Sequence, residues 1–135
     1  MSTAIIYWSG TGNTEAMANA IAKGIGAEAE VFSVDNVDSS VVGKYEKLAF
    51  GCPSMGAEVL EEESFEPFFS AIEGSLGGKK VALFGSYGWG DGEWMRDWQV
   101  RVNATGASLF EEGFIQQEAP DEGACEEFGS KFDAF

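Results

Sequence analysis

Short, nearly continuous runs of apolar residues recur along this chain, separated by longer stretches of mixed character. The runs lie at residues 4–8, 31–34, 48–50 and 81–84, and a last one is divided between 109–110 and 114–115. Strands that are buried on both faces carry runs of this kind, and they belong to parallel sheets that helices cover on each side. The pattern therefore predicts a parallel sheet of about five strands.

Between these runs, apolar residues recur at every third or fourth position, which is the period of an amphipathic helix. Helical spacing is found within residues 17–25, 65–72, 95–102 and 125–135. The alternation predicts an α/β fold with three αβα layers, built on a five-stranded, doubly wound parallel sheet. The crossover at 35–47 is expected to be short, because Val41, Val42 and Tyr45 give it only a small apolar face.

The loop after the first predicted strand has the composition of a phosphate-binding loop. Residues 9–14, Ser-Gly-Thr-Gly-Asn-Thr, combine two glycines, three hydroxyls and an amide without a charge. Backbone N–H groups, short hydroxyl donors and the start of a helix together suit a phosphate group. The alternative is a polar turn in which Asn13 or Thr14 caps the following helix.

Two better-known phosphate loops are excluded by single positions. A nucleoside triphosphate loop requires a lysine, and the first lysine of the chain is Lys23. A dinucleotide fingerprint requires a third glycine at position 15, where Glu15 stands. The loop is therefore expected to hold a single phosphate by hydroxyls and amides alone.

Two later loops each place one large, soft side chain among glycines. Met55 precedes Gly56 after the third predicted strand, and Trp89 stands between Gly88 and Gly90 after the fourth. In a doubly wound sheet, ligands bind outside the carboxyl ends of the strands, so these loops are expected to meet the phosphate loop. Trp89 would stack on a planar ligand and Met55 would cover its other face. Surface packing of Trp89 is the alternative.

Few side chains are available for other chemistry, because the chain has no histidine and only two cysteines, Cys52 and Cys125. A Ser-His-Asp triad, a Cys2His2 zinc site and a four-cysteine cluster are excluded, and no metal site is expected. A tyrosine-phosphatase loop would need an arginine six residues after Cys52, where Glu58 stands. A receiver domain would need acidic residues at Ser9 and Gly10. Cys125 is expected to be a buried core residue.

Charge and length narrow the class of partner and the compartment. Eight basic against 23 acidic residues give a net charge of −15, which should repel nucleic acid and anionic membranes and favour a basic protein partner. Solubility is the alternative reason for the acidity. The 135 residues carry neither a membrane span nor a secretory signal, so a single domain over residues 1–135, monomeric and cytoplasmic, is expected.

On the evidence of these loops, the chain resembles the flavodoxins. It is similar to the short-chain, clostridial-type members over its whole length. Residues 7–15, Tyr-Trp-Ser-Gly-Thr-Gly-Asn-Thr-Glu, resemble the family's FMN phosphate loop, and residues 84–92 resemble its flavin-stacking loop. The short break at 111–113 is typical of the short-chain form. The resemblance implies strand order 2-1-3-4-5 and a non-enzymatic, low-potential one-electron carrier. Its FMN would shuttle mainly between semiquinone and hydroquinone.

By this resemblance, the phosphate is held by hydroxyl and amide side chains and the ring by Met55 and Trp89. Glu58 would accept from the flavin N3–H, and the Met55–Gly56 peptide would turn over on reduction. The complete set of expected cofactor-binding residues is Ser9, Gly10, Thr11, Gly12, Asn13, Thr14, Ser54, Met55, Gly56, Ala57, Glu58, Ser86, Tyr87, Gly88, Trp89, Gly90 and Gln117.

An acidic rim is expected around the same loops. Glu61, Glu62 and Glu63 are hypothesised to lower the reduction potential and to dock basic reductases or oxidoreductases; a solvated helix start is the alternative. Besides an electron carrier, two other classes of function stay open for this sequence. One is an FMN enzyme that reduces quinones or nitro compounds, and the other is an interaction domain with an empty site.

Overall fold

The computed structural model describes residues 2–135, in which parallel strands form one sheet. The strands are β1 (Thr3–Tyr7), β2 (Ala29–Ser33), β3 (Lys47–Gly51), β4 (Lys80–Tyr87), β5 (Ser108–Leu109) and β6 (Phe114–Gln117). Their order is β2-β1-β3-β4, and both β5 and β6 pair with β4. The fifth strand position is thus shared by two short pieces, and the predicted order 2-1-3-4-5 is confirmed.

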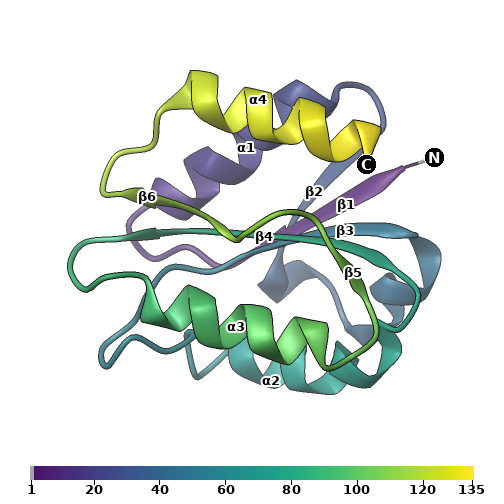
Figure 1. Ribbon diagram of the computed structural model, residues 1–135, viewed down its shortest axis with the longest axis horizontal. Coiled ribbons are helices and arrows are strands. Elements are labelled where there is room, and N and C mark those ends of the chain that lie inside the picture. Colours follow the sequence, from purple (N-terminus) through teal and green to yellow (C-terminus); the bar gives the residue numbers. More distant parts are fainter. Residues whose placement is uncertain (1) are drawn as a thin grey trace.

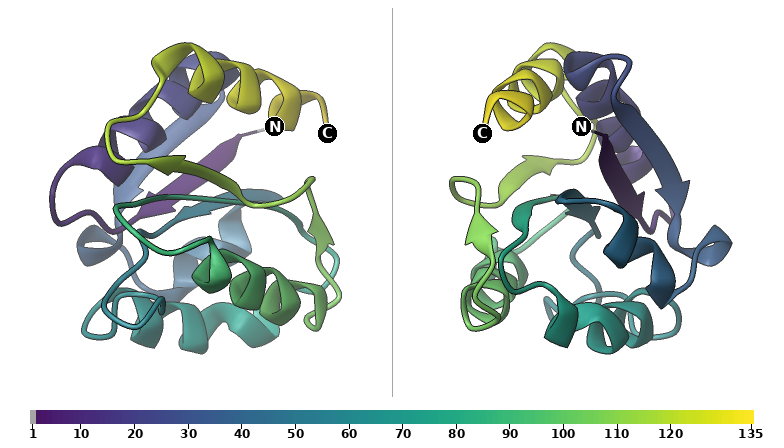
Figure 2. Two further views of the ribbon diagram at one scale, coloured as in Figure 1. Left: turned by 60° about the vertical axis from the view of Figure 1, so that its left-hand side comes forward. Right: turned by 90° about the vertical axis from the view of Figure 1, so that its right-hand side faces the viewer.

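Helices cover both faces of the sheet, as Figures 1 and 2 show. In Figure 1, α1 (Asn13–Ile25) and α4 (Glu122–Ala134) lie above the sheet, while α2 (Phe65–Ile72) and α3 (Glu93–Asn103) lie below it. Between β2 and β3 the chain forms only the short 3-10 helices η1 (Val34–Asn36) and η2 (Ser39–Lys44), so the predicted short crossover is confirmed. A third 3-10 helix, η3 (Glu73–Ser75), extends α2. Within residues 2–135, no helix combines the length and apolarity needed to cross a membrane.

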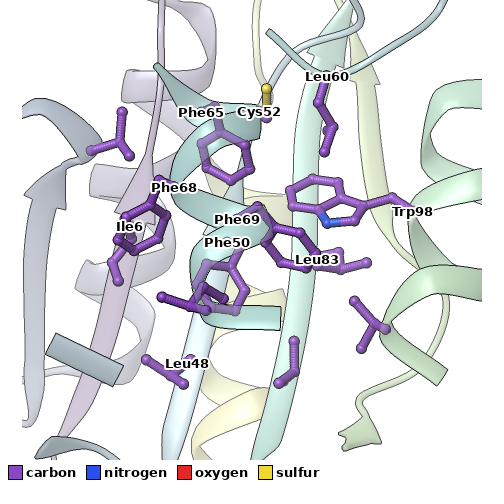
Figure 3. Close-up of a cluster of buried hydrophobic side chains, with 14 of the residues drawn as sticks. Ile6, Leu48, Phe50, Cys52, Leu60, Phe65, Phe68, Phe69, Leu83 and Trp98 are labelled. Atoms are coloured by element: carbon purple, nitrogen blue, oxygen red, sulfur yellow. The ribbon is translucent and has the colours of Figure 1, made fainter. Parts of the chain in front are cut away.

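An aromatic cluster fixes α2 and α3 to the sheet. The Trp98 ring of α3 meets the rings of Phe65 and Phe69 edge-on, at centroid distances of 5.5 and 5.7 Å, and Phe69 meets Phe50 of β3 at 5.5 Å (Figure 3). Edge-to-face pairs of this kind add to the free energy that burial of the rings contributes. The cluster positions the two helix starts that lie next to the loops of interest.

The Arg101 guanidinium joins the same two helices at the surface. It contacts the Glu66 carboxylate at 2.7 and 2.9 Å and the Glu73 carboxylate at 3.0 Å, and it lies 4.9 Å from the centre of the Phe69 ring. The hydrogen bonds from Arg101 hold the pKa of Glu66 below its usual value. This contact supports the packing of α2 against α3.

Helices α1 and α4 approach each other at two glycines. A Cβ atom at Gly24 would overlap the carbonyl oxygen of Glu126, and one at Gly129 would overlap the carbonyl oxygen of Ile21. Only glycine permits backbones to come this close. Cys125 is fully buried beside this crossing, which confirms its predicted place in the core.

Strand register brings the loops together at one edge. Tyr7 at the end of β1 pairs with Gly51 at the end of β3, and Tyr87 at the end of β4 pairs with Gln117 at the end of β6. Because all these strands are parallel, the loops that follow them leave from the same edge of the sheet.

Candidate functional site

A cavity of about 330 Å³ lies where these loops meet. Its volume is within the range of small-molecule sites, and it joins the loops after β1, β3, β4 and β6. The lining residues are Trp8, Gly10, Thr11, Asn13, Pro53, Ser54, Met55, Ser86, Tyr87, Gly88 and Glu118. The structure therefore brings the three loops that the sequence singled out to one hollow.

The first loop turns sharply to place the start of α1 at the cavity. Gly12 adopts a left-handed backbone with φ 98°, and its N–H donates to Ser9 Oγ at 3.0 Å. A Cβ atom at Gly10 would lie 2.9 Å from the outer edge of the Trp8 ring, so a larger residue there would require the Trp8 side chain to shift. No side-chain hydrogen bond caps α1, so the alternative that Asn13 or Thr14 serves as the cap is wrong. Asn13, the first residue of α1, lines the cavity, so the positive end of the helix dipole lies at the cavity.

Two buried hydroxyl groups meet beneath this loop. Thr14 Oγ1 and Ser86 Oγ are 2.8 Å apart, and both residues are almost completely buried. A hydroxyl has one proton to donate, so this single hydrogen bond uses the proton of one partner and leaves the proton of the other. Ser86 lines the cavity, whereas Thr14 is not among the lining residues. The second proton is therefore available to the cavity when Thr14 donates to Ser86.

The loop after β3 folds into a tight turn anchored on β4. Met55 N donates to Val59 O at 2.9 Å, Val59 N donates to Met55 O at 3.1 Å, and Ser54 N donates to Ser86 O at 3.0 Å. Gly56 and Glu58 complete the turn in left-handed conformations, with φ of 44° and 55°. Met55 and Ser54 line the cavity, whereas Gly56, Ala57 and Glu58 lie outside its lining.

Glu58 joins this turn to the beginning of α3. Its Oε1 accepts from the N–H groups of Gly92 and Glu93 at 3.2 and 3.1 Å, and its carboxylate packs against Gly90. Because Oε1 of Glu58 already accepts these two hydrogen bonds, the predicted bond from the flavin N3–H would use Oε2. This role of Glu58 stays a prediction.

Trp89 stands beside the cavity with its side chain largely in solvent. It is 64% exposed, in the bend between β4 and α3. A tryptophan this exposed has little protein surface to pack against, so a planar ligand would supply contact that the protein alone does not. Its predicted stacking role stays a prediction, because Trp89 is not among the lining residues.

Comparison with known proteins identifies the family. The sequence profile described as Flavodoxin matches residues 5–129. A flavodoxin of Clostridium beijerinckii is 52% identical over 132 residues, which cover 94% of this chain and 96% of that protein. The chain belongs to the flavodoxin family.

Two further comparisons extend over nearly the whole of this flavodoxin. A flavodoxin of Megasphaera elsdenii is 44% identical over 128 residues, with 93% of each chain covered. The solution structure of the two-electron reduced Megasphaera elsdenii flavodoxin matches with a TM-score of 0.90 and 43% identity, covering 98% of this chain and 99% of that one. The predicted resemblance to short-chain flavodoxins is confirmed.

Family membership decides the class of function. Flavodoxins are FMN-containing, low-potential electron carriers, so this flavodoxin transfers electrons and is not an enzyme. It donates electrons to redox proteins. The predicted cofactor and function class are confirmed, and the two other function classes left open by the sequence are wrong.

Three lining residues were missed by sequence reasoning: Trp8, Pro53 and Glu118. Glu118 follows β6 with φ 55°, and its N–H donates to Tyr87 O at 2.8 Å. The pairing of β6 with β4 places Glu118 at the cavity, and the composition of the loop does not indicate this pairing. Gln117 was expected in the site, and its side-chain amide instead donates to Gly88 O at 3.2 Å, outside the cavity lining.

Glu61 was expected on the acidic rim, and this is wrong. Glu61 is only 6% exposed, and its carboxylate accepts from the backbone N–H groups of Glu63, Ser64 and Phe65 at 2.9, 2.8 and 2.7 Å. The carboxylate thus satisfies donors at the start of α2 that would otherwise be unpaired. Glu62 lies in solvent and, with Glu63, remains available for the rim.

Cys52 also serves the fold. Burial raises the pKa of its thiol to about 12, and its Sγ accepts from the N–H of Glu61 at 3.3 Å. A thiol that stays protonated is no nucleophile at neutral pH, in agreement with the exclusion of a phosphatase site.

Proposed function

We propose that this flavodoxin binds FMN non-covalently in the cavity at the carboxyl edge of the sheet. The phosphate lies on residues 9–14 and Ser86, and the isoalloxazine ring lies between Met55 and Trp89. The proposed set comprises the predicted residues Ser9, Gly10, Thr11, Gly12, Asn13, Thr14, Ser54, Met55, Gly56, Ala57, Glu58, Ser86, Tyr87, Gly88, Trp89, Gly90 and Gln117, together with Trp8, Pro53 and Glu118.

The hydroxyl pair of Thr14 and Ser86 supports this proposal most strongly. Two buried hydroxyls 2.8 Å apart, beside an uncapped helix start, form a site that prefers an anion with several acceptor oxygens. The lining contains no lysine or arginine among residues 2–135, so binding of the phosphate rests on neutral donors and the helix dipole.

Bound FMN supplies a ring that takes up and releases electrons one at a time. The protein orients this ring by holding the phosphate, and Met55 and Trp89 exclude water from its faces. Glu58 holds the two ring loops together through the start of α3. Exposed carboxylates nearby make added negative charge unfavourable and so lower the reduction potential.

We further infer that this flavodoxin acts as a cytoplasmic monomer, one domain over residues 1–135, and docks basic redox proteins at its acidic rim. The rim comprises Glu62, Glu63, Asp91, Glu93 and Asp97. Asp91 is partly offset by Arg96, whose guanidinium lies 3.0 Å away. Complementary charge raises association rates and is screened by salt, so stopped-flow rates with a basic redox protein at two salt concentrations test the preference.

The site is tested by comparing FMN with riboflavin, which lacks the phosphate. Affinities of the apoprotein are measured by calorimetry for the wild type, T14V, S86A and the control S130A, whose serine is exposed on α4. Hydrogen bonds to a charged group contribute about 1.5–3 kcal/mol, so T14V and S86A should each weaken FMN binding about 10- to 100-fold. Riboflavin affinity should stay unchanged. Equal losses for both ligands would contradict the assignment of the phosphate site.

A further inference from the structure

A second hollow lies beside β2, the strand at the outer edge of the sheet. It has a volume of about 610 Å³ and lies between Glu30 and Phe32 of β2 and side chains of residues 35–45, the segment that leads to β3. Among residues 2–135, it shares no lining residue with the cavity proposed for FMN. This hollow, the edge groove, is therefore a separate feature of the surface.

The edge groove follows from the short crossover between β2 and β3. A full helix there would cover one face of β2, but η1 and η2 are only three and six residues long. No residue of β2 is fully buried, whereas four of the five residues in each of β1 and β3 are buried. The rings of Phe32 and Tyr45, with centroids 6.4 Å apart, give the groove an apolar surface. One face of β2 thus stays partly open.

The backbone of β2 offers a second means of binding. Figure 2 shows β2 at the outer edge of the sheet, and within residues 2–135 it pairs with β1 alone. The backbone groups along its outer side therefore have no strand partner, and such an edge can accept a further strand. Glu30 and Phe32 are two positions apart and so lie on the same face of β2. A strand added to this edge would lie next to both.

Charge decides which kind of segment suits this edge. The groove is lined by the carboxylates of Glu30, Asp35 and Asp38 and by a single basic residue, Lys44, and all four residues are exposed. Lysine or arginine at every second position of an added strand would place basic side chains on the groove face. Their aliphatic stems would pack on the two rings, and their charged ends would reach the carboxylates.

The opposite face of β2 suits apolar side chains at the alternate positions. Ala29 and Val31 lie on that face and pack, partly buried, against the core beneath α1 and α4. Apolar residues of an added strand would extend this surface. The segment that fits both faces therefore alternates basic and apolar residues.

We propose that the outer edge of β2, together with the edge groove, binds an extended segment of a partner protein in which basic and apolar residues alternate. The segment adds one strand to the sheet. Backbone hydrogen bonds supply affinity, and the carboxylates of the groove select basic side chains. The site is separate from the acidic rim at the carboxyl edge, and the inference does not rest on the proposed binding of FMN.

The test uses the FMN-loaded protein, in which the cavity is occupied, and the peptide Lys-Val-Lys-Val-Lys-Val with both ends blocked. NMR titration follows the backbone amide signals. We expect saturable shifts concentrated in residues 29–45. Shifts that gather at the carboxyl-edge rim, shifts spread evenly over the acidic surface, or no binding would each overturn the proposal.

Two N-methylated peptides separate strand addition from attraction of charge. One carries its methyl groups on the valine nitrogens and the other on the lysine nitrogens, and in a strand these two sets point to opposite sides. Methyl groups on the side that faces β2 block pairing, so one peptide should bind at least about tenfold more weakly than the other. Equal affinities of the two peptides would overturn strand addition.

Charge variants test the selection of basic side chains. The double variant E30Q/D35N should weaken binding of the unmethylated peptide about fivefold, and added salt should reduce this difference. The control E122Q/E127Q removes the same charge from exposed positions on α4, across the sheet from the groove, and should change the affinity less than twofold. Equal losses in the two double variants would show that only the net charge matters and would overturn the assignment to the groove.

Discussion

At the scale of single residues, carboxylates with similar sequence surroundings do different work. Glu58 and Glu61 are three positions apart, yet Glu58 joins two ligand loops and Glu61 holds the start of α2 from a buried position. Glu62, the residue after Glu61, lies in solvent. Sequence reasoning assigned Glu61 to the rim because its neighbours are acidic, and composition does not reveal which of three consecutive glutamates turns inward.

Substitution of Glu61 should separate these roles. In E61Q, one of the two oxygens becomes an amide that donates, so a backbone N–H at the start of α2 loses its acceptor. We expect the free energy of unfolding to fall by about 1–2 kcal/mol, measured by denaturation in urea. E62Q is the control and should change stability by less than about 0.5 kcal/mol. Similar losses in both variants would argue against the role of Glu61.

At the scale of elements, the hydrophobic pattern was sufficient to predict most of the fold. Runs of buried strands and helical spacing correctly predicted the parallel sheet, its layers, the split fifth position and the short second crossover. The contact of α1 with α4 was not predicted. Gly24 and Gly129 are far apart in the chain, and a glycine within a predicted helix does not indicate which other helix it contacts. The register of β6 on β4, which places Glu118 at the cavity, could not be predicted from the hydrophobic pattern either.

The crossing of α1 and α4 gives a prediction with a control in the same helix. G129A should destabilise the protein by about 1–3 kcal/mol, because its Cβ would overlap the Ile21 carbonyl. G123A should be neutral or stabilising, because its Cβ would meet only the Asp121 Oδ1 atom at 3.4 Å and alanine favours a helix. Thermal unfolding of the two variants measures the difference. A destabilisation of G123A as large as that of G129A would contradict the role of close backbone approach.

At the scale of the whole molecule, charge is distributed unevenly between the two edges of the sheet. Lys47 and Lys80 stand at the amino ends of β3 and β4, where they donate to backbone carbonyls near the end of α4. The rim carboxylates and Glu118 gather at or near the opposite, carboxyl edge, where the cavity proposed for the cofactor lies. We therefore expect the net charge of −15 to act strongly at the proposed cofactor site.

The most direct measurement is a stepwise potentiometric titration of the FMN-loaded protein at low and at high salt. We predict two separate one-electron steps, the second at a lower potential than free FMN shows and rising as salt screens the acidic edge. A single two-electron step at the potential of free FMN, unchanged by salt, would contradict one-electron transfer by a cofactor held in this cavity.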